Sequence, residues 1–281
     1  MKKILVPTDF SPNAAKAIDY AVQISKLNQA TIYIIHACDL LDTTFKDKLE
    51  LKEEYNKHIT DEAFTKLEMI RQSIEDTEGV LVNTQLYNGP VTDTVLTAAK
   101  EHGVDLVVMG TLGHSGIKGR IFGSKTASVI GRTDIPVIAI PLEYEWSEPK
   151  KFLLAINHAA EAAGIVDPVF DLARIFKAET EVAIFTYEDF SVAVEYPEHA
   201  KEIGRIETAL KNRYSDVTIH PEHLSGQRFG ETLEEFIKEK EIDLLAMITH
   251  KRNLVSSIFN RSMTKRMAYH TRVPLLAIPA R

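Results

Sequence analysis

The sequence predicts an α/β fold that occurs twice in one chain, each copy a parallel sheet with helices on both faces. Short apolar runs rich in Val, Ile and Leu alternate with longer amphipathic stretches, the pattern of strands joined by crossover helices. The alternation runs through residues 1–141, is interrupted, and starts again through residues 151–281. A chain of 281 residues is long enough for two domains with these boundaries.

Five apolar runs predict the strands of the first half. They cover residues 1–7, 31–37, 80–86, 105–109 and 135–141. Helices are expected between them. The first begins after Ser11, a good N-cap residue, with Pro12 at the first helical position. The second follows the polar segment 40–54 and places one apolar stripe against the sheet, formed by Ile59, Ala63, Leu67, Ile70 and Ile74.

The second half repeats the first after a polar linker at residues 142–150, which contains Trp146, the only tryptophan. The run 152–157 matches 4–9, and 243–247 matches 105–109. The run 273–279 matches 135–141.

Composition excludes several classes of protein. The net charge is −7 and no strongly basic tract is present, so a nucleic-acid partner is not expected. The single cysteine, Cys38, excludes an intrachain disulfide. No secretory or membrane-spanning stretch is apparent, so we expect a cytoplasmic protein without a membrane partner.

A glycine-containing loop between the strand at 105–109 and the helix starting near Ser124 is the main candidate site. Gly110 and Gly113 offer unhindered backbone, with φ above zero allowed, and Gly123 immediately precedes the helix. The first N–H groups of that helix and its positive dipole end attract a phosphate chain. From the residues alone, a structural turn is an equal alternative.

Other candidates are less specific. Residues 119–126 fall one glycine short of a P-loop and lie too far from their strand to act as one. Asp9 follows the first strand, where its carboxylate suits either ligand hydroxyls or a helix cap. His220 and His223 leave a zinc site open, but no further ligand completes a known spacing, so no metal is expected. Lys125 adds positive charge near the phosphate position. Nothing resembles a set of catalytic residues.

The glycine spacing, with two residues between Gly110 and Gly113, nine before Gly123, and then Ser124, resembles the signature of the ATP-binding branch of the universal stress protein family. The resemblance covers nearly the whole chain. It implies two tandem open five-stranded sheets of order 3-2-1-4-5, like those of adenine nucleotide α-hydrolases. It also implies that Asp9 holds the adenosine part and that the backbone near Ala37 faces the adenine. The expected cofactor-binding residues are Pro7, Thr8, Asp9, Ala37, Met109, Gly110, Gly113, Gly123, Ser124 and Lys125.

The resemblance therefore implies a stress-response protein that binds ATP or ADP, with or without Mg²⁺, as a sensor or regulator with at most weak ATP hydrolysis. One alternative is a slow ATPase or nucleotidyl-transfer enzyme of the α-hydrolase group, although the first strand lacks the glycine loop of those enzymes. Another is a scaffold without a ligand, used for protein association.

We expect one nucleotide per chain, because the second half has lost the motif. Ile248 and Lys251 replace Gly110 and Gly113, Asn157 replaces Asp9, and Asn260 or Arg261 lies near the position of Gly123. Its expected role is architectural. The final strand of each half is an apolar edge strand, and pairing these two edges within the chain would protect both. A further homodimer is compatible with this arrangement but not required by it.

Overall fold

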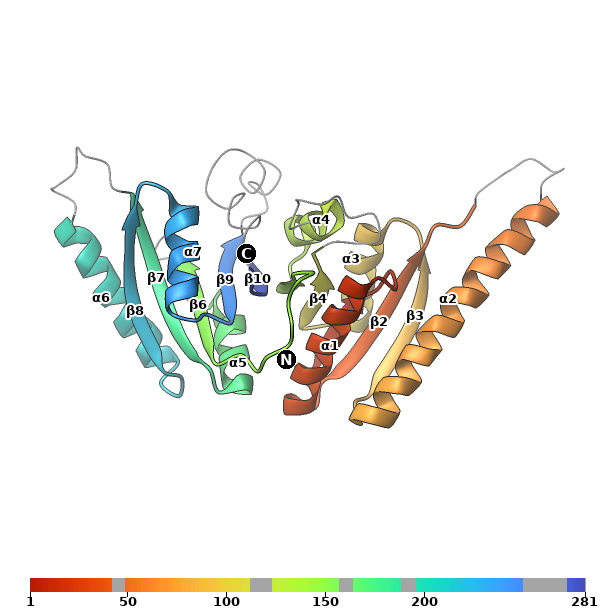
Figure 1. The fold of residues 1–281 in the computed structure, drawn as a ribbon, viewed down its shortest axis with the longest axis horizontal. Helices are drawn as coiled ribbons and strands as arrows, with labels where there is room; N and C mark the ends of the chain where they lie inside the picture. The colour runs from red at the N-terminus through yellow and green to blue at the C-terminus, as the bar shows by residue number, and fades with distance from the viewer. Residues whose placement is uncertain (42–48, 112–122, 157–163, 188–195, 250–271, 281) are drawn as a thin grey trace.

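The structure, a computed structural model, describes residues 1–41, 49–111, 123–156, 164–187, 196–249 and 272–280 (Figure 1). The first half contains β1 (Lys3–Pro7), α1 (Pro12–Asn28), β2 (Thr31–Cys38), α2 (Leu49–Glu78), β3 (Val82–Asn88), α3 (Val91–His102), β4 (Leu106–Gly110), α4 (Ser124–Arg132) and β5 (Val137–Ile140). The second half contains β6 (Lys151–Ile156), α5 (Asp167–Phe176), β7 (Glu179–Tyr187), α6 (Tyr196–Arg213), β8 (Ile219–Gly226), α7 (Phe229–Glu239), β9 (Leu244–Thr249) and β10 (Leu275–Pro279).

All these strands form one ten-stranded sheet with the order β3-β2-β1-β4-β5-β10-β9-β6-β7-β8. The pairs within each half are parallel, and each half has the expected order 3-2-1-4-5. The expectation of two separate sheets was wrong, because β5 and β10 pair antiparallel, Ala139 opposite Leu275 and Val137 opposite Ala277. This is the edge-to-edge pairing that the two apolar final strands predicted.

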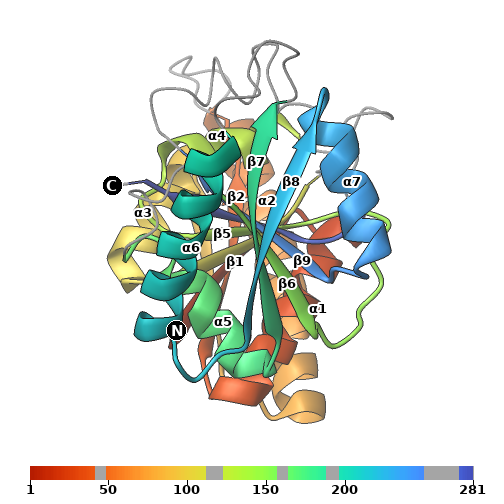
Figure 2. The same ribbon diagram turned by 90° about the vertical axis from the view of Figure 1, so that its left-hand side faces the viewer.

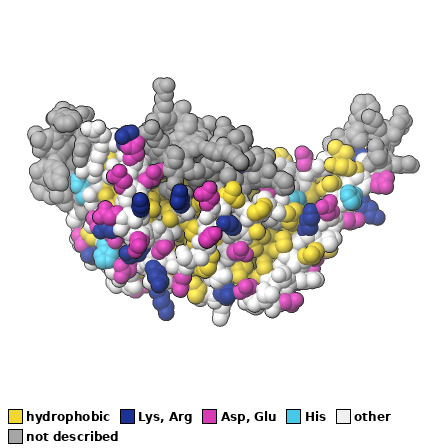
Figure 3. Space-filling model, in the orientation of Figure 1, with side chains coloured by type: hydrophobic (Ala, Val, Ile, Leu, Met, Phe, Trp, Pro, Cys, Tyr) yellow, Lys and Arg dark blue, Asp and Glu magenta, His cyan; other side chains and the backbone are white. Residues whose placement is uncertain are grey.

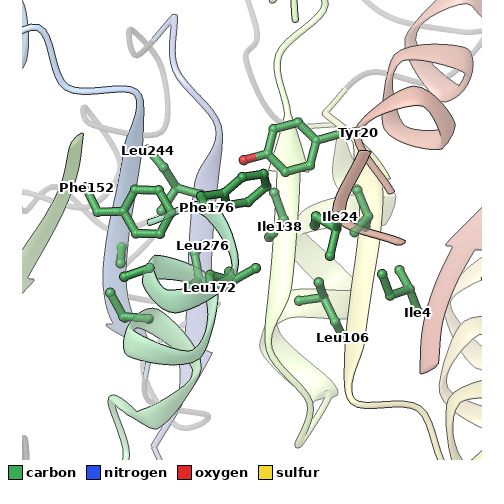
Figure 4. Close-up of a cluster of buried hydrophobic side chains, with 14 of the residues drawn as sticks. Ile4, Tyr20, Ile24, Leu106, Ile138, Phe152, Leu172, Phe176, Leu244 and Leu276 are labelled. Carbon is green, nitrogen blue, oxygen red and sulfur yellow. The ribbon is translucent and has the colours of Figure 1, made fainter. Parts of the chain in front are cut away.

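The cores on the two faces of the sheet are organised differently. On one face a single cluster of buried side chains runs across both halves, with Ile138 and Leu276 at the seam (Figure 4). On the other face there are two separate clusters: one contains residues of α3 and α4 together with Ala277 of β10, and the other contains residues of α7. Figure 2 shows the helices on both sides of the twisted sheet. The continuous face makes the two halves one folded body.

A repeated aspartate sets the alignment of the first and fourth strands in each half. The Asp105 carboxylate accepts hydrogen bonds from the backbone N–H groups of Lys2 (2.6 Å) and Lys3 (3.0 Å). In the second half Asp243 accepts from the N–H groups of Lys150 (2.7 Å) and Lys151 (2.9 Å). The matching Asp-Leu pairs of the sequence repeat are therefore explained by strand alignment.

The linker at residues 142–150 is held against both halves. The Trp146 ring lies 5.1 Å from that of Tyr20 on α1 and 6.1 Å from that of Phe176 on α5. Lys16 on α1 donates its ammonium to the Tyr144 carbonyl oxygen at 2.6 Å. The linker is therefore part of the contact between the halves.

Several element boundaries differ from the expectations. Helix α2 begins at Leu49, inside the segment expected to be a polar lead-in, and β3 begins at Val82 instead of residue 80. The expected stripe on α2 faces the sheet, with Ala63, Leu67 and Ile74 buried. Figure 3 shows acidic and basic side chains intermingled over the described part of one face. Among the described residues, every helix is too short or too polar to cross a bilayer.

Candidate functional site

A cavity of about 350 Å³ lies at the carboxyl ends of β1, β2 and β4. Its volume is within the range of small-molecule pockets, roughly 300–1,000 Å³. Strands β2 and β4 flank β1 in the sheet, so the cavity lies at the topological switch point, where open α/β sheets bind ligands. The lining residues are Pro7, Thr8, Asp9, Ala14, Ile35, His36, Ala37, Val91, Thr94, Val95, Met109, Gly110, Lys125 and Thr126.

The structure brings most of the sequence-predicted site residues to this cavity. Those that line it are Pro7, Thr8, Asp9, Ala37, Met109, Gly110 and Lys125. Gly123 and Ser124 do not line it but start the helix that carries Lys125 and Thr126. Gly113 lies outside the described residues.

The turn after β1 positions Asp9. The expected N-cap is confirmed, because the Ser11 hydroxyl oxygen accepts a hydrogen bond from the N–H of Ala14 at 3.2 Å, and Pro12 opens α1. One Asp9 carboxylate oxygen accepts from the N–H of Ser11 at 3.1 Å. Asp9 therefore has the turn-stabilising role that the sequence left open, and its side chain also lines the cavity.

The opposite end of the cavity is formed by the start of α4. Gly123 is its N-cap residue, with φ −64° and ψ 154°, and its N–H donates to the Thr111 carbonyl oxygen. The Thr126 hydroxyl donates to the Gly110 carbonyl oxygen at 2.8 Å, which ties the helix to the end of β4. The first N–H groups of a helix have no intrahelical acceptor. This end, with the Lys125 side chain, suits an anionic group.

Gly110 has a packing role that the sequence did not indicate. It does not adopt positive φ, so the expected left-handed freedom is not used there. A Cβ at this position would lie 2.6 Å from the Oδ1 atom of Asn13. Asn13 is buried and donates its side-chain amide to the Ile140 carbonyl oxygen at 3.0 Å. The absence of a side chain at Gly110 is thus required by α1, whatever binds in the cavity.

Sequence reasoning missed the apolar wall of the cavity. Much of it is formed by Ile35 of β2 and by Val91 and Val95 of α3. The sequence predicted the turn at 88–90 and a helix over residues 91–102, which is α3, but it did not indicate that this helix borders the cavity. The Cys38 thiol next to Ala37 is buried, and burial raises its pKa, so it stays protonated at neutral pH.

The second half differs at the matching position. Gly110 pairs with Ile140, and Ile248 pairs with Ile278 in the same register. Ile248 therefore occupies the position of Gly110, as the sequence alignment predicted. Asn157, Lys251, Asn260 and Arg261 lie outside the described residues.

The two histidines considered for zinc both lie in β8, with His220 as the second residue of the strand. Because they are three residues apart in a strand, their side chains point to opposite faces of the sheet. His220 lies 3.6 Å from a Glu179 carboxylate oxygen. In the part of the chain that the structure describes, no three His, Cys, Asp or Glu side chains are grouped to hold a metal ion.

This fold and cavity define an α/β protein of duplicated design with a ligand-sized pocket in its first half. The sequence model of the Universal stress protein family matches residues 1–141 and 149–279. The chain belongs to the universal stress protein family.

Individual relatives agree with this assignment. A universal stress protein of Methanocaldococcus jannaschii is 28% identical over 153 residues, which cover 50% of this chain and 94% of the relative. One from Mycolicibacterium smegmatis is 23% identical over 297 residues, covering 99% of this chain and 97% of the relative. The crystal structure of a universal stress protein from Archaeoglobus fulgidus has a TM-score of 0.77 at 16% identity, covering 99% of this chain and 98% of that one, which shows a shared fold.

Proposed function

We propose that the cavity of the first half binds one adenine nucleotide, ATP or ADP, and that this protein acts as a nucleotide-dependent regulator in stress responses. The observation that carries the proposal is the order of chemistry along the cavity. An apolar wall from β2 and α3 suits a base, the Asp9 carboxylate suits ribose hydroxyls, and the start of α4 with Lys125 suits phosphates. The glycine spacing of the family's ATP-binding branch supports the choice of adenine.

We further propose that the second half binds no nucleotide in this way. Ile248 carries a branched side chain where Gly110 has none. The second half contributes β10, which covers the edge of β5, and the core that continues across the seam. Its role in the proposal is to complete the fold of the first half.

Mass spectrometry of the intact chain under native conditions identifies any nucleotide that co-purifies. Titration calorimetry of the stripped protein with ATP, ADP, cyclic AMP and GTP then measures stoichiometry and base preference. We expect one site per chain, adenine preferred over guanine. Absence of binding to all adenylates, or two equal sites, would contradict the proposal. A turnover assay with Mg²⁺ separates a binding protein from the slow enzyme of the alternative reading.

A matched pair of variants tests the role of Asp9. Asp9→Asn keeps an oxygen that can accept from the N–H of Ser11 but removes the charge. We expect affinity for ATP to fall about tenfold or more, since hydrogen bonds to charged groups are worth about 1.5–3 kcal/mol. Asp76→Asn, on the exposed end of α2, is the control and should bind like the unmodified chain.

A further inference from the structure

Phe10 has an unusual backbone conformation at the edge of the cavity. Its φ is +61°, in the left-handed region that bulky residues avoid. The other described non-glycine residues with positive φ lie at or just after the ends of helices: Gln29 and Lys177 are the C-caps of α1 and α5, and Glu241 follows the C-cap of α7. Phe10 instead precedes a helix. Strain of this kind persists where the surroundings impose it, often at functional sites.

The hydrogen bonds of the turn at residues 8–11 depend on this conformation. The Phe10 N–H donates to the Thr8 hydroxyl oxygen at 3.0 Å, and the next N–H, of Ser11, donates to the Asp9 carboxylate at 3.1 Å. The Thr8 N–H donates to the Ile35 carbonyl oxygen at 2.8 Å. The turn is therefore anchored to β2 and fixes one oxygen of Asp9.

Glycine would adopt this backbone conformation without strain, but the contacts of the Phe10 ring explain why a phenylalanine is present. The ring packs against the His36 ring in a tilted arrangement, with ring centroids 4.5 Å apart and an interplanar angle of 31°. The Lys66 ammonium of α2 lies 5.4 Å from the centroid of the same ring, in cation–π range. The backbone strain thus accompanies a ring that is held between β2 and α2.

His36 connects this ring contact to the turn. Its Nδ1 atom lies 2.8 Å from the Thr8 carbonyl oxygen. A carbonyl oxygen only accepts, so Nδ1 carries the hydrogen and is the donor. His36, Thr8 and Asp9 all line the cavity. The histidine is therefore oriented by a hydrogen bond at its edge and by the Phe10 ring at its face.

We propose that Phe10 and His36 are positioning residues of this pocket, and that the contact between their rings holds the strained turn at 8–11 so that Asp9 meets the ligand in one fixed geometry. Without the ring contact the turn samples several shapes, and ligand binding has to restrict it to one. The lost free energy then appears as weaker binding. This inference rests on the proposed function and names residues of the same site that the sequence did not indicate.

Three substitutions of Phe10 separate positioning from packing. Phe10→Gly removes the ring and relieves the strain, Phe10→Leu removes the ring and keeps apolar bulk, and Phe10→Tyr keeps the ring. If the ring contact positions the turn, Gly and Leu variants should bind ATP about tenfold more weakly, equivalent to about 1.4 kcal/mol. The Tyr variant should bind within about twofold of the unmodified chain.

Stability measured on the same proteins provides the contrast. Thermal unfolding of the Phe10→Gly variant should change little, because relief of strain offsets the lost packing of the ring. Native affinity in the Phe10→Gly protein would overturn the proposal, whatever its melting temperature. Loss of stability without loss of affinity would assign the ring to packing alone and would also overturn it.

A spectroscopic measurement keeps the proposal testable even if the unmodified chain binds no adenylate. Long-range ¹H–¹⁵N NMR spectra report which imidazole nitrogen carries the hydrogen, and His36→Asn assigns the His36 signals. We expect the Nδ1–H form in the unmodified chain, its loss in the Gly and Leu variants, and its return with Tyr. Such a result without nucleotide binding would reject the proposed function and retain the positioning pair. Spectra unchanged in all variants would reject the pair.

Discussion

The side chain of Asn13 occupies the space that a Cβ on Gly110 would need. The amide of Asn13 at the start of α1 bonds to the end of β5, and its Oδ1 atom would lie 2.6 Å from that Cβ. The backbone oxygen of Asn13 would lie 2.9 Å from it, so a rotation of the side chain does not remove the clash. One contact therefore ties together α1, β4 and β5.

Gly110→Ala should destabilise the protein by about 1–3 kcal/mol, the usual cost of overpacking a rigid interior. Chemical denaturation measures the loss. Gly204→Ala is the matched control, because a Cβ there meets no atom within 4 Å and Gly204 lies in α6. The control should stabilise the chain by about 0.5–1 kcal/mol, since alanine is the better helix residue. Equal effects of the two substitutions would contradict the packing account.

Gly123→Val tests the anion end of the cavity. The backbone angles of Gly123 are ones that valine adopts readily. We expect a stability loss of about 1 kcal/mol at most, from a poorer N-cap. Affinity for ATP should fall more than tenfold, because the side chain blocks approach to the helix start. Unchanged affinity, with native circular dichroism, would mean that phosphate does not bind there.

Glu181→Gln should make stability less sensitive to pH. Burial of Glu181 on β7 raises the pKa of its carboxyl group, and this is the largest effect on it. The nearby His220 and Lys240 act in the opposite direction, but more weakly. With a folded-state pKa above the unfolded one, the folded state binds more protons, so stability falls as pH rises through that interval. The Gln variant lacks this loss, so its stability relative to the unmodified chain should rise as the pH increases above about 4, the ordinary pKa range of a glutamate.

Urea denaturation at a series of pH values checks this. Glu235→Gln on the exposed side of α7 is the control and should run parallel to the unmodified chain. A Gln variant that lost stability relative to the unmodified chain as pH rose would show that the Glu181 carboxylate is stabilised in the fold.

Trp146 reports on the contact between the halves, because it is the only tryptophan. Phe176→Ala removes a buried ring beside it. We expect a loss of about 3–5 kcal/mol and a red shift of the folded-state emission, because the Trp146 side chain, already 38% exposed, loses a ring that covers part of it. Phe64→Ala, at an exposed site on α2, should change neither quantity appreciably. Native emission in the Phe176 variant would place the indole outside this cluster.

Residues 1–141 expressed alone should self-associate. Removal of β10 leaves the apolar strand β5 as an open sheet edge. Analytical ultracentrifugation at matched domain concentrations should show dimers of the fragment where the intact chain has fewer. A folded fragment that stays monomeric at every concentration would contradict this account of the second half.

The sequence predicted the fold well because its information is local and repeated. Apolar β-branched runs located the strands, and Ser11-Pro12 located the start of α1. It predicted the joining of β5 to β10 from the two apolar final strands, although it described the sheets as separate.

The site was harder to predict, because its parts are distant in sequence. The residues at the strand ends, such as Asp9 and Gly110, were found. The steric constraint that excludes a side chain at Gly110 was not found, because it comes from Asn13, which is distant in the sequence. The apolar wall that α3 supplies was not predicted either. Periodicity shows that a helix is amphipathic, but it does not show which cavity the helix borders.

The pairing of β5 with β10 also means that one strand is synthesised long before its partner. About 135 residues separate Ile140 from Leu275, which at typical rates of synthesis corresponds to roughly 7 to 27 s. Throughout that interval β5 has left the ribosome without its partner strand. Neighbouring nascent chains on one messenger carry the same open edge, so slow elongation or dense ribosome loading favours exchange of β10 between copies. We therefore expect slower synthesis of the second half to raise the share of chains that exchange β10 with a neighbour.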